Sequence, residues 1–255
     1  MTSLRSVFAS ATALATLSFT IPTASWAEQP IPVVATFSIL GDMVERIGGE
    51  HIALTTLVGP EGDTHVYQPT PKAARSVAEA DLLFMNGLEF EGWLERLAEA
   101  ASFDGAMVVA TTGVSPIAFE EHEDDEHGEH DEHAGHDHGT FDPHAWQSLD
   151  NAVIYANNIA AGLAQADPAN ASEYYTNRAV FVAEIVALKS DIDAMMAALP
   201  ADKRTVVTPH DAFGYFAEAY NLTFEAPQGM STESEVSAAD VAALITQIRR
   251  ESISA

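Results

Sequence analysis

The chain has 255 residues, of which 47% are hydrophobic and none is cysteine. This apolar content suffices for a substantial core and two modest domains, and it excludes a disordered chain and a fold held by disulfides. The formal net charge of -27 excludes nucleic acid as a partner, because so many carboxylates repel phosphates and attract cations.

The first 27 residues have the layout of a secretory signal peptide. Arg5 lies near the start, an apolar run covers residues 7–21, and Ser-Trp-Ala at 25–27 gives a small-x-small cleavage site. The run is shorter than the roughly 20 residues of a spanning helix, which disfavours the alternative of a membrane anchor. We therefore expect a mature chain that begins near Glu28 and works in the periplasm as a monomer.

From residue 31 onward, short β-type runs alternate with amphipathic stretches, which favours an α/β fold with a mainly parallel sheet. The pattern predicts helix starts near Ser38, Thr70, Glu91 and Asp150. We interpret residues 28–167 as an N-terminal βα lobe. The expected strands are 33–36, 52–58, 82–86 and 107–111, and the expected helices are 39–47, 71–80, 93–100 and 150–166.

Residues 169–199 carry apolar side chains at helical spacing over about eight turns. A helix of this length is uncommon in a small domain, so we interpret residues 168–200 as a rigid connector between two lobes. Residues 201–255 then begin a second βα lobe, and two strands rarely make a stable sheet, so we expect this lobe to be incomplete here. Its expected strands are 205–208 and 222–225, and its expected helices are 212–220 and 236–250.

A low-complexity segment at residues 120–139 holds ten of the 38 acidic residues and has almost nothing apolar to bury. Imidazoles interleaved with carboxylates predict several weak zinc sites, because ordering such a chain costs about 1–2 kcal/mol per residue. The alternative is a solvated acidic loop without a metal role. The histidines of this segment are His122, His127, His130, His133, His136 and His138.

Three further histidines, His65, His144 and His210, each follow a predicted strand. In open α/β sheets ligands bind at the carboxyl ends of strands, so two facing lobes would bring these imidazoles into one cleft. Neutral imidazole suits zinc, and three such ligands leave a fourth position for a carboxylate or water. A lone histidine near a loop is more often only solvated or hydrogen-bonded, and His51, at a strand start, keeps that interpretation.

Three motifs surround these histidines, namely DTHVYQPTP at 63–71, DPHAW at 142–146 and TPHDAFGYF at 208–216. In this order they resemble the ligand loops of the periplasmic zinc-binding proteins of ABC transporters, in the metal-binding cluster A-I family of solute-binding proteins. The resemblance covers residues 31–255. It implies two lobes joined by a rigid helix, Zn²⁺ held by His65, His144 and His210, and delivery to an ABC permease in the inner membrane. A periplasmic zinc metallochaperone is a further expected partner.

The resemblance also bears on the choice of metal. In the family, a histidine as third ligand is typical of zinc binders and a glutamate of manganese binders, so His210 favours zinc, with manganese as the alternative. The family's fourth ligand is an acidic residue from a region beyond Ala255. Some zinc members use a carboxylate directly before the first histidine, where this chain has Thr64.

Two other functions remain open at this point. Three histidines and a water are also the plan of a catalytic zinc site, although the chain has no His-Glu-x-x-His helix and only Asp211 follows a ligand directly as a candidate base. We expect no enzyme. A periplasmic zinc buffer or chaperone without a transporter is the other alternative. In each case zinc competes with protons, and we expect affinity to fall near pH 6.5.

Overall fold

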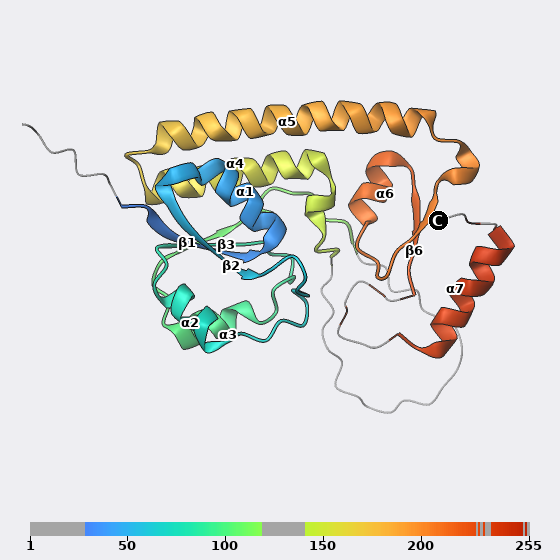
Figure 1. The fold of residues 1–255 in the computed structure, drawn as a ribbon, viewed down its shortest axis with the longest axis horizontal. Coiled ribbons are helices and arrows are strands. Elements are labelled where there is room, and N and C mark those ends of the chain that lie inside the picture. The colour runs from blue at the N-terminus through green and yellow to red at the C-terminus, as the bar shows by residue number, and fades with distance from the viewer. Residues whose placement is uncertain are drawn as a thin grey trace, which may run out of the picture.

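The structure is a computed structural model that describes residues 29–118, 141–227, 229, 232, 236–251 and 253. The predicted signal peptide and the histidine- and acid-rich segment 120–139 lie outside the described residues. Figure 1 shows the elements gathered into two bodies, with the long helix α5 running along both. We call the elements from β1 to α4 the first lobe and those from β5 to α7 the second lobe.

A four-stranded parallel sheet in the order β2-β1-β3-β4 forms the centre of the first lobe. Its pairing places Ile31 opposite Ile52 and Phe37 opposite Val58. The two central strands are buried on both faces, which explains their continuous apolar runs. The parallel α/β fold is confirmed. The strands are β1 (Ile31–Phe37), β2 (Ile52–Val58), β3 (Leu82–Met85) and β4 (Ala106–Val109).

Four helices cover this sheet, with α1 and α4 on one face and α2 and α3 on the other (Figure 1). Their buried side chains join those of β1 and β3 in one hydrophobic core. Because all four strands are parallel, the loops that follow them lie at the same end of the sheet. The helices are α1 (Ser38–Gly48), α2 (Pro71–Ala78), α3 (Leu94–Ala101) and α4 (Leu149–Ala166).

The predicted helix starts differ in how well they agree with the structure. The Thr70 hydroxyl accepts a hydrogen bond from the Ala73 N–H at 3.2 Å, so it caps α2 as predicted. The cap of α4 is Ser148, two residues before the predicted Asp150, because its hydroxyl is the group that accepts from a first-turn N–H. Ser38 is the first helical residue of α1, without a side-chain cap.

Glu91 was wrongly predicted as a start of α3, which begins at Leu94. Its side chain points into the protein and is 4% exposed. The carboxylate there accepts hydrogen bonds from backbone N–H groups of the loop after β3, an environment that local sequence did not reveal.

The connecting helix α5 (Ala171–Ala198) has 28 residues and packs along α1 and α4. At its N-terminal half the Asn177 amide donates to the Ile47 carbonyl at 3.1 Å, and the Arg46 guanidinium lies 2.9 Å from a carboxylate oxygen of Glu184. The helix then extends past the first lobe to the second (Figure 1). One continuous helix therefore supports both lobes. No helix in the described part of the chain is long and apolar enough to cross a membrane.

The second lobe contains two parallel strands, β5 (Thr205–Val207) and β6 (Thr223–Glu225), and two helices, α6 (Gly214–Tyr220) and α7 (Ala238–Glu251). The Phe213 and Phe224 rings stack at 4.8 Å between centroids and join the start of α6 to the small sheet. Three short 3-10 helices complete the described elements: η1 (Gly49–His51), η2 (Ala145–Gln147) and η3 (Ala201–Lys203).

Candidate metal centre

The loop after β2 carries His65. The Asp63 carboxylate accepts the His65 N–H at 3.0 Å, which fixes the turn just before the imidazole. The Trp93 indole N–H donates to the Thr64 carbonyl at 2.8 Å, and the Phe90 ring contacts the imidazole with 4.8 Å between centroids. Two aromatic residues that precede α3 therefore hold this loop.

His144 lies directly before η2 and is 2% exposed. One oxygen of Asp142 accepts the His144 backbone N–H at 2.9 Å and lies 2.8 Å from the ring Nδ1. A carboxylate at this distance assigns the ring proton to Nδ1, so that Nε2 keeps its lone pair. This is the orientation in which a histidine binds a metal through Nε2.

His210 comes from the second lobe, in the loop between β5 and α6. The Thr208 hydroxyl donates to the His210 carbonyl at 3.0 Å and stabilises this loop. The His210 ring lies 5.5 Å from the His144 ring and 6.0 Å from the His65 ring, measured between centroids.

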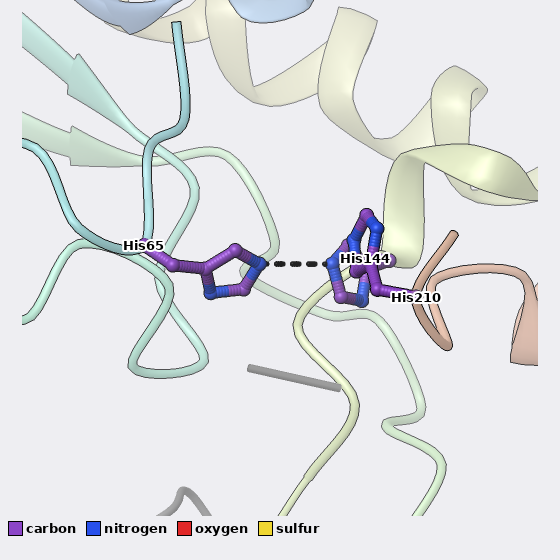
Figure 2. A group of neighbouring side chains, drawn as sticks. All are labelled: His65, His144 and His210. Atoms are coloured by element: carbon purple, nitrogen blue, oxygen red, sulfur yellow. Dashed lines mark hydrogen bonds between the residues drawn. The ribbon is translucent and has the colours of Figure 1, made fainter. Parts of the chain in front are cut away.

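The three imidazoles converge between the lobes (Figure 2). Each offers one ring nitrogen, and these nitrogens all lie within 4.8 Å of one another. The Nε2 atoms of His65 and His144 are 3.2 Å apart. Two nitrogens bound at about 2.1 Å to one tetrahedral zinc lie about 3.4 Å apart, so this pair already has the spacing that one ion needs.

The other histidines have different surroundings. His51 lies 2.9 Å from a carboxylate oxygen of Glu173, and its ring packs against Tyr174, so it has a structural environment away from the cluster. The six histidines predicted for metal capture lie outside the described residues.

Burial favours the neutral form of His65 and His210. It lowers the pKa of His65 from 6.5 to about 4, with a further contribution from the neighbouring His144. Burial and His144 also lower the pKa of His210. The expected pH of proton competition, near 6.5, is therefore too high for these two residues, because 6.5 is the pKa of an exposed histidine.

A buried polar network that local sequence patterns did not reveal adjoins His144. The Glu91 carboxylate accepts from the Thr36 hydroxyl at 2.6 Å and the Asn86 N–H at 2.7 Å. The Asn86 amide in turn donates to the Pro143 carbonyl at 2.8 Å, directly before His144, and accepts from the Tyr155 hydroxyl. Burial raises the pKa of Glu91 to about 7, although these hydrogen bonds act in the opposite direction.

Two α/β lobes spanned by one long helix, with imidazoles converging between them, define a solute-binding protein that carries metal ions. The family described as the periplasmic component A of the zinc-uptake complex, ZnuA, matches residues 33–255. The chain belongs to this family of periplasmic metal-binding solute-binding proteins.

Its relatives are named for different metals. The chain is 33% identical over 229 residues to the iron-binding protein YfeA of Yersinia pestis, covering 86% of this chain and 69% of YfeA. It is 31% identical over 231 residues to the manganese ABC transporter substrate-binding lipoprotein PsaA of Streptococcus mitis, covering 88% and 71%. The structure of the periplasmic zinc-binding protein TroA of Treponema pallidum superposes with a TM-score of 0.75, at 26% identity, over 87% of this chain and 75% of TroA.

Proposed function

We propose that this protein captures Zn²⁺ in the periplasm and delivers it to an ABC permease in the inner membrane. The observation that carries the proposal is the convergence of three imidazole nitrogens within 4.8 Å, two from the first lobe and one from the second. The names of PsaA and other relatives, which are substrate-binding proteins of metal ABC transporters, support the permease as partner. The proposal further includes a monomeric mature protein and a periplasmic zinc metallochaperone as a second partner.

The donor set supports zinc over manganese and iron. The cluster consists of neutral nitrogen donors, whereas manganese prefers carboxylate and water oxygens. For a given set of nitrogen ligands, affinity also increases from manganese through iron to zinc. We therefore expect zinc to displace either of the other two ions when all are present at equal concentration.

Calorimetric titration of the mature protein with zinc tests the assignment. We expect one tight site in the wild-type protein and its loss in His65→Ala, because a ligand atom is removed. His51→Ala is the matched control, since His51 lies away from the cluster beside Glu173. Equal affinity in wild type and His65→Ala would show that the cluster is not the zinc site.

We also propose that His122, His127, His130, His133, His136 and His138 capture zinc for this site. Support comes from the described residues at both ends of their segment. Ala118 and Phe141 form an antiparallel bridge, and the Asp142 N–H donates to the Ile117 carbonyl at 2.9 Å. Phe141 is close to His144 in the sequence, and the bridge places Ala118 beside Phe141, so both ends of the segment lie near the site. Replacing all six histidines by asparagine should remove weak zinc equivalents and leave the tight site; unchanged stoichiometry would refute the capture role.

We infer that the site carries metal and does not perform hydrolysis. The nearest carboxylate to His144 is engaged, because one oxygen of Asp142 already binds both the backbone and the ring of that residue. It is poorly placed to take a proton from a metal-bound water. Zinc-dependent cleavage of an activated ester that disappears in His144→Ala would instead support an enzyme.

A further inference from the structure

Both first-lobe imidazoles are preceded by an aspartate in the same local arrangement. Asp63 accepts the His65 N–H at 3.0 Å, and Asp142 accepts the His144 N–H at 2.9 Å. Each aspartate thus fixes the backbone of the histidine that follows it by two positions. Displacing either aspartate would therefore displace the histidine that we propose as a ligand.

Tyr215 of the second lobe contacts the second of these aspartates. Its hydroxyl donates to the Asp142 carbonyl at 2.9 Å and accepts from the Ile117 N–H at 3.2 Å, and the side chain is 5% exposed. The preceding residue is Gly214, where a Cβ would lie only 2.6 Å from the Asp142 Oδ2. The absence of a side chain there allows α6 to approach the Asp142 carboxylate closely.

Thr232 of the second lobe contacts the other aspartate. It lies between β6 and α7, and its hydroxyl donates to the Asp63 Oδ2. The other oxygen of the same carboxylate holds the His65 N–H. Two hydroxyl groups of the second lobe therefore bind the two aspartates that position the first-lobe imidazoles.

We propose that these two contacts, the Tyr215–Asp142 latch and the Thr232–Asp63 latch, control the rate at which metal leaves the site. This inference rests on the proposed function. His210 belongs to the second lobe, so separating the lobes withdraws one proposed ligand from the other two. The same movement breaks both latches. Tyr215 and Thr232 are thus positioning residues that hold the lobes together around the ion until the partner separates them.

The test uses the variants Tyr215→Phe and Thr232→Val in the full mature chain, which remove each latch hydroxyl and keep the side-chain size. Zinc dissociation is measured by stopped flow against an excess of chelator. A net hydrogen bond contributes about 0.5–1.5 kcal/mol, so we expect each variant to release zinc about two- to tenfold faster, and the double variant to show roughly the product. One zinc should still bind tightly per chain.

Two control variants remove a hydroxyl group from the helices of the second lobe without touching either latch. Tyr220→Phe alters α6, where the Tyr220 hydroxyl is buried without a hydrogen-bond partner in the described part of the chain. Thr246→Val alters α7, where the hydroxyl donates to the Ala242 carbonyl within the same helix. Both should release zinc at the wild-type rate. Latch variants that release zinc no faster than these controls would overturn the proposal.

The absorption spectrum of the Co²⁺-loaded protein separates positioning from ligation. The latch hydroxyls are not ligands, so Tyr215→Phe and Thr232→Val should keep the wild-type spectrum while release accelerates. A lower melting temperature with unchanged release would indicate a purely structural role and would contradict the proposal. If His65→Ala loses tight zinc while the latch variants behave as wild type, only the latch proposal fails. If His65→Ala keeps tight zinc, the proposed function fails first.

Discussion

Asp142 binds both a proposed metal ligand and a residue of the second lobe. Its carboxylate binds the ring and backbone of His144, and its carbonyl accepts from Tyr215. A carboxylate that holds Nδ1–H makes the opposite nitrogen a stronger donor, and the loss of such a partner typically weakens metal binding 10–100-fold.

We therefore expect Asp142→Asn to weaken zinc binding by about one order of magnitude or more while leaving one site per chain. The fold should persist, because asparagine is nearly isosteric and the carbonyl bond to Tyr215 does not involve the side chain. Competition with a chelating dye measures the affinity. Asp150→Asn, on the exposed start of α4, is the control, and an affinity of Asp142→Asn equal to that of this control would show that the pair with His144 is unimportant.

Glu91 gives a second prediction at the residue scale. Its pKa is about 7 in the folded protein and 4.5 for an ordinary glutamate, so the folded state keeps a proton between these values that the unfolded state loses. The free energy of unfolding should consequently fall as pH rises from 4.5 to 7. Glu91→Gln should lose this part of the slope in chemical denaturation at several pH values. The exposed Glu95→Gln should keep it, and an unchanged slope in Glu91→Gln would argue against a proton on this residue.

Individual residues also show what sequence could predict at this scale. His65, His144 and His210 stand in short motifs, so neighbouring residues were enough to single them out. Glu91 has no such signal, because its partner Thr36 is 55 positions away and meets it only when β1 and β3 pair. The latch residues depend in the same way on contacts between lobes.

At the scale of elements, Arg204 connects the ends of two helices. Its guanidinium donates to the Met196 carbonyl at 2.7 Å, near the end of α5, and to the Tyr220 carbonyl at 3.1 Å, at the end of α6. The positive charge also suits the negative ends of both helix dipoles. Arginine is suited to this position because its planar fork presents several donors at once.

Arg204→Lys should loosen the second lobe, because a lysine retains the charge but cannot reach both helix ends. Hydrogen exchange of the metal-free protein is the measurement. Amides of β5, β6 and α6 should exchange faster, whereas those of β1 and β3 should be unaffected. Arg249→Lys, on the exposed side of α7, is the control. If the amides of β5, β6 and α6 exchange no faster in Arg204→Lys than in the wild-type protein, other contacts hold α5 and α6 together.

Element types were predictable where periodicity is strong, and their ends were less so. The spacing of apolar residues predicted α5 to within two residues at its start and one at its end. The end of β4 was placed at residue 111 instead of Val109. Ala110 and Thr111 form a turn, yet both are buried and still donate to the Met85 and Asn86 carbonyls, so composition alone could not show where the strand ends.

For the whole molecule, the free energy of unfolding depends on pH through two residues whose effects have opposite sign. Folded His65 takes up a proton near pH 4, whereas an ordinary histidine does so near 6.5. The unfolded state therefore binds more protons between these values, and the free energy of unfolding falls as pH falls from 6.5 to 4. Glu91 acts in the opposite direction over much of the same range, so the two slopes partly offset each other.

Zinc binding should reflect His65 and His210 more directly. Because the pKa of each is lowered, we expect affinity to be retained as pH falls from 7.5 through 6 and to drop steeply toward pH 4. Calorimetric titration across this range measures it. A loss of affinity already centred on pH 6.5 would indicate that the imidazoles titrate as exposed groups.

The bridge between Ala118 and Phe141 has a practical consequence for protein engineering. A segment whose two ends are pinned side by side can be exchanged for one of another length at low cost, since each doubling of a loop costs only about 0.6 kcal/mol in closure entropy. The junction also adjoins Asp142 and Tyr215. A fluorescent domain spliced between residues 118 and 141 would then sense the same lobe movement that accompanies metal release, which makes this position an attractive starting point for a genetically encoded zinc reporter.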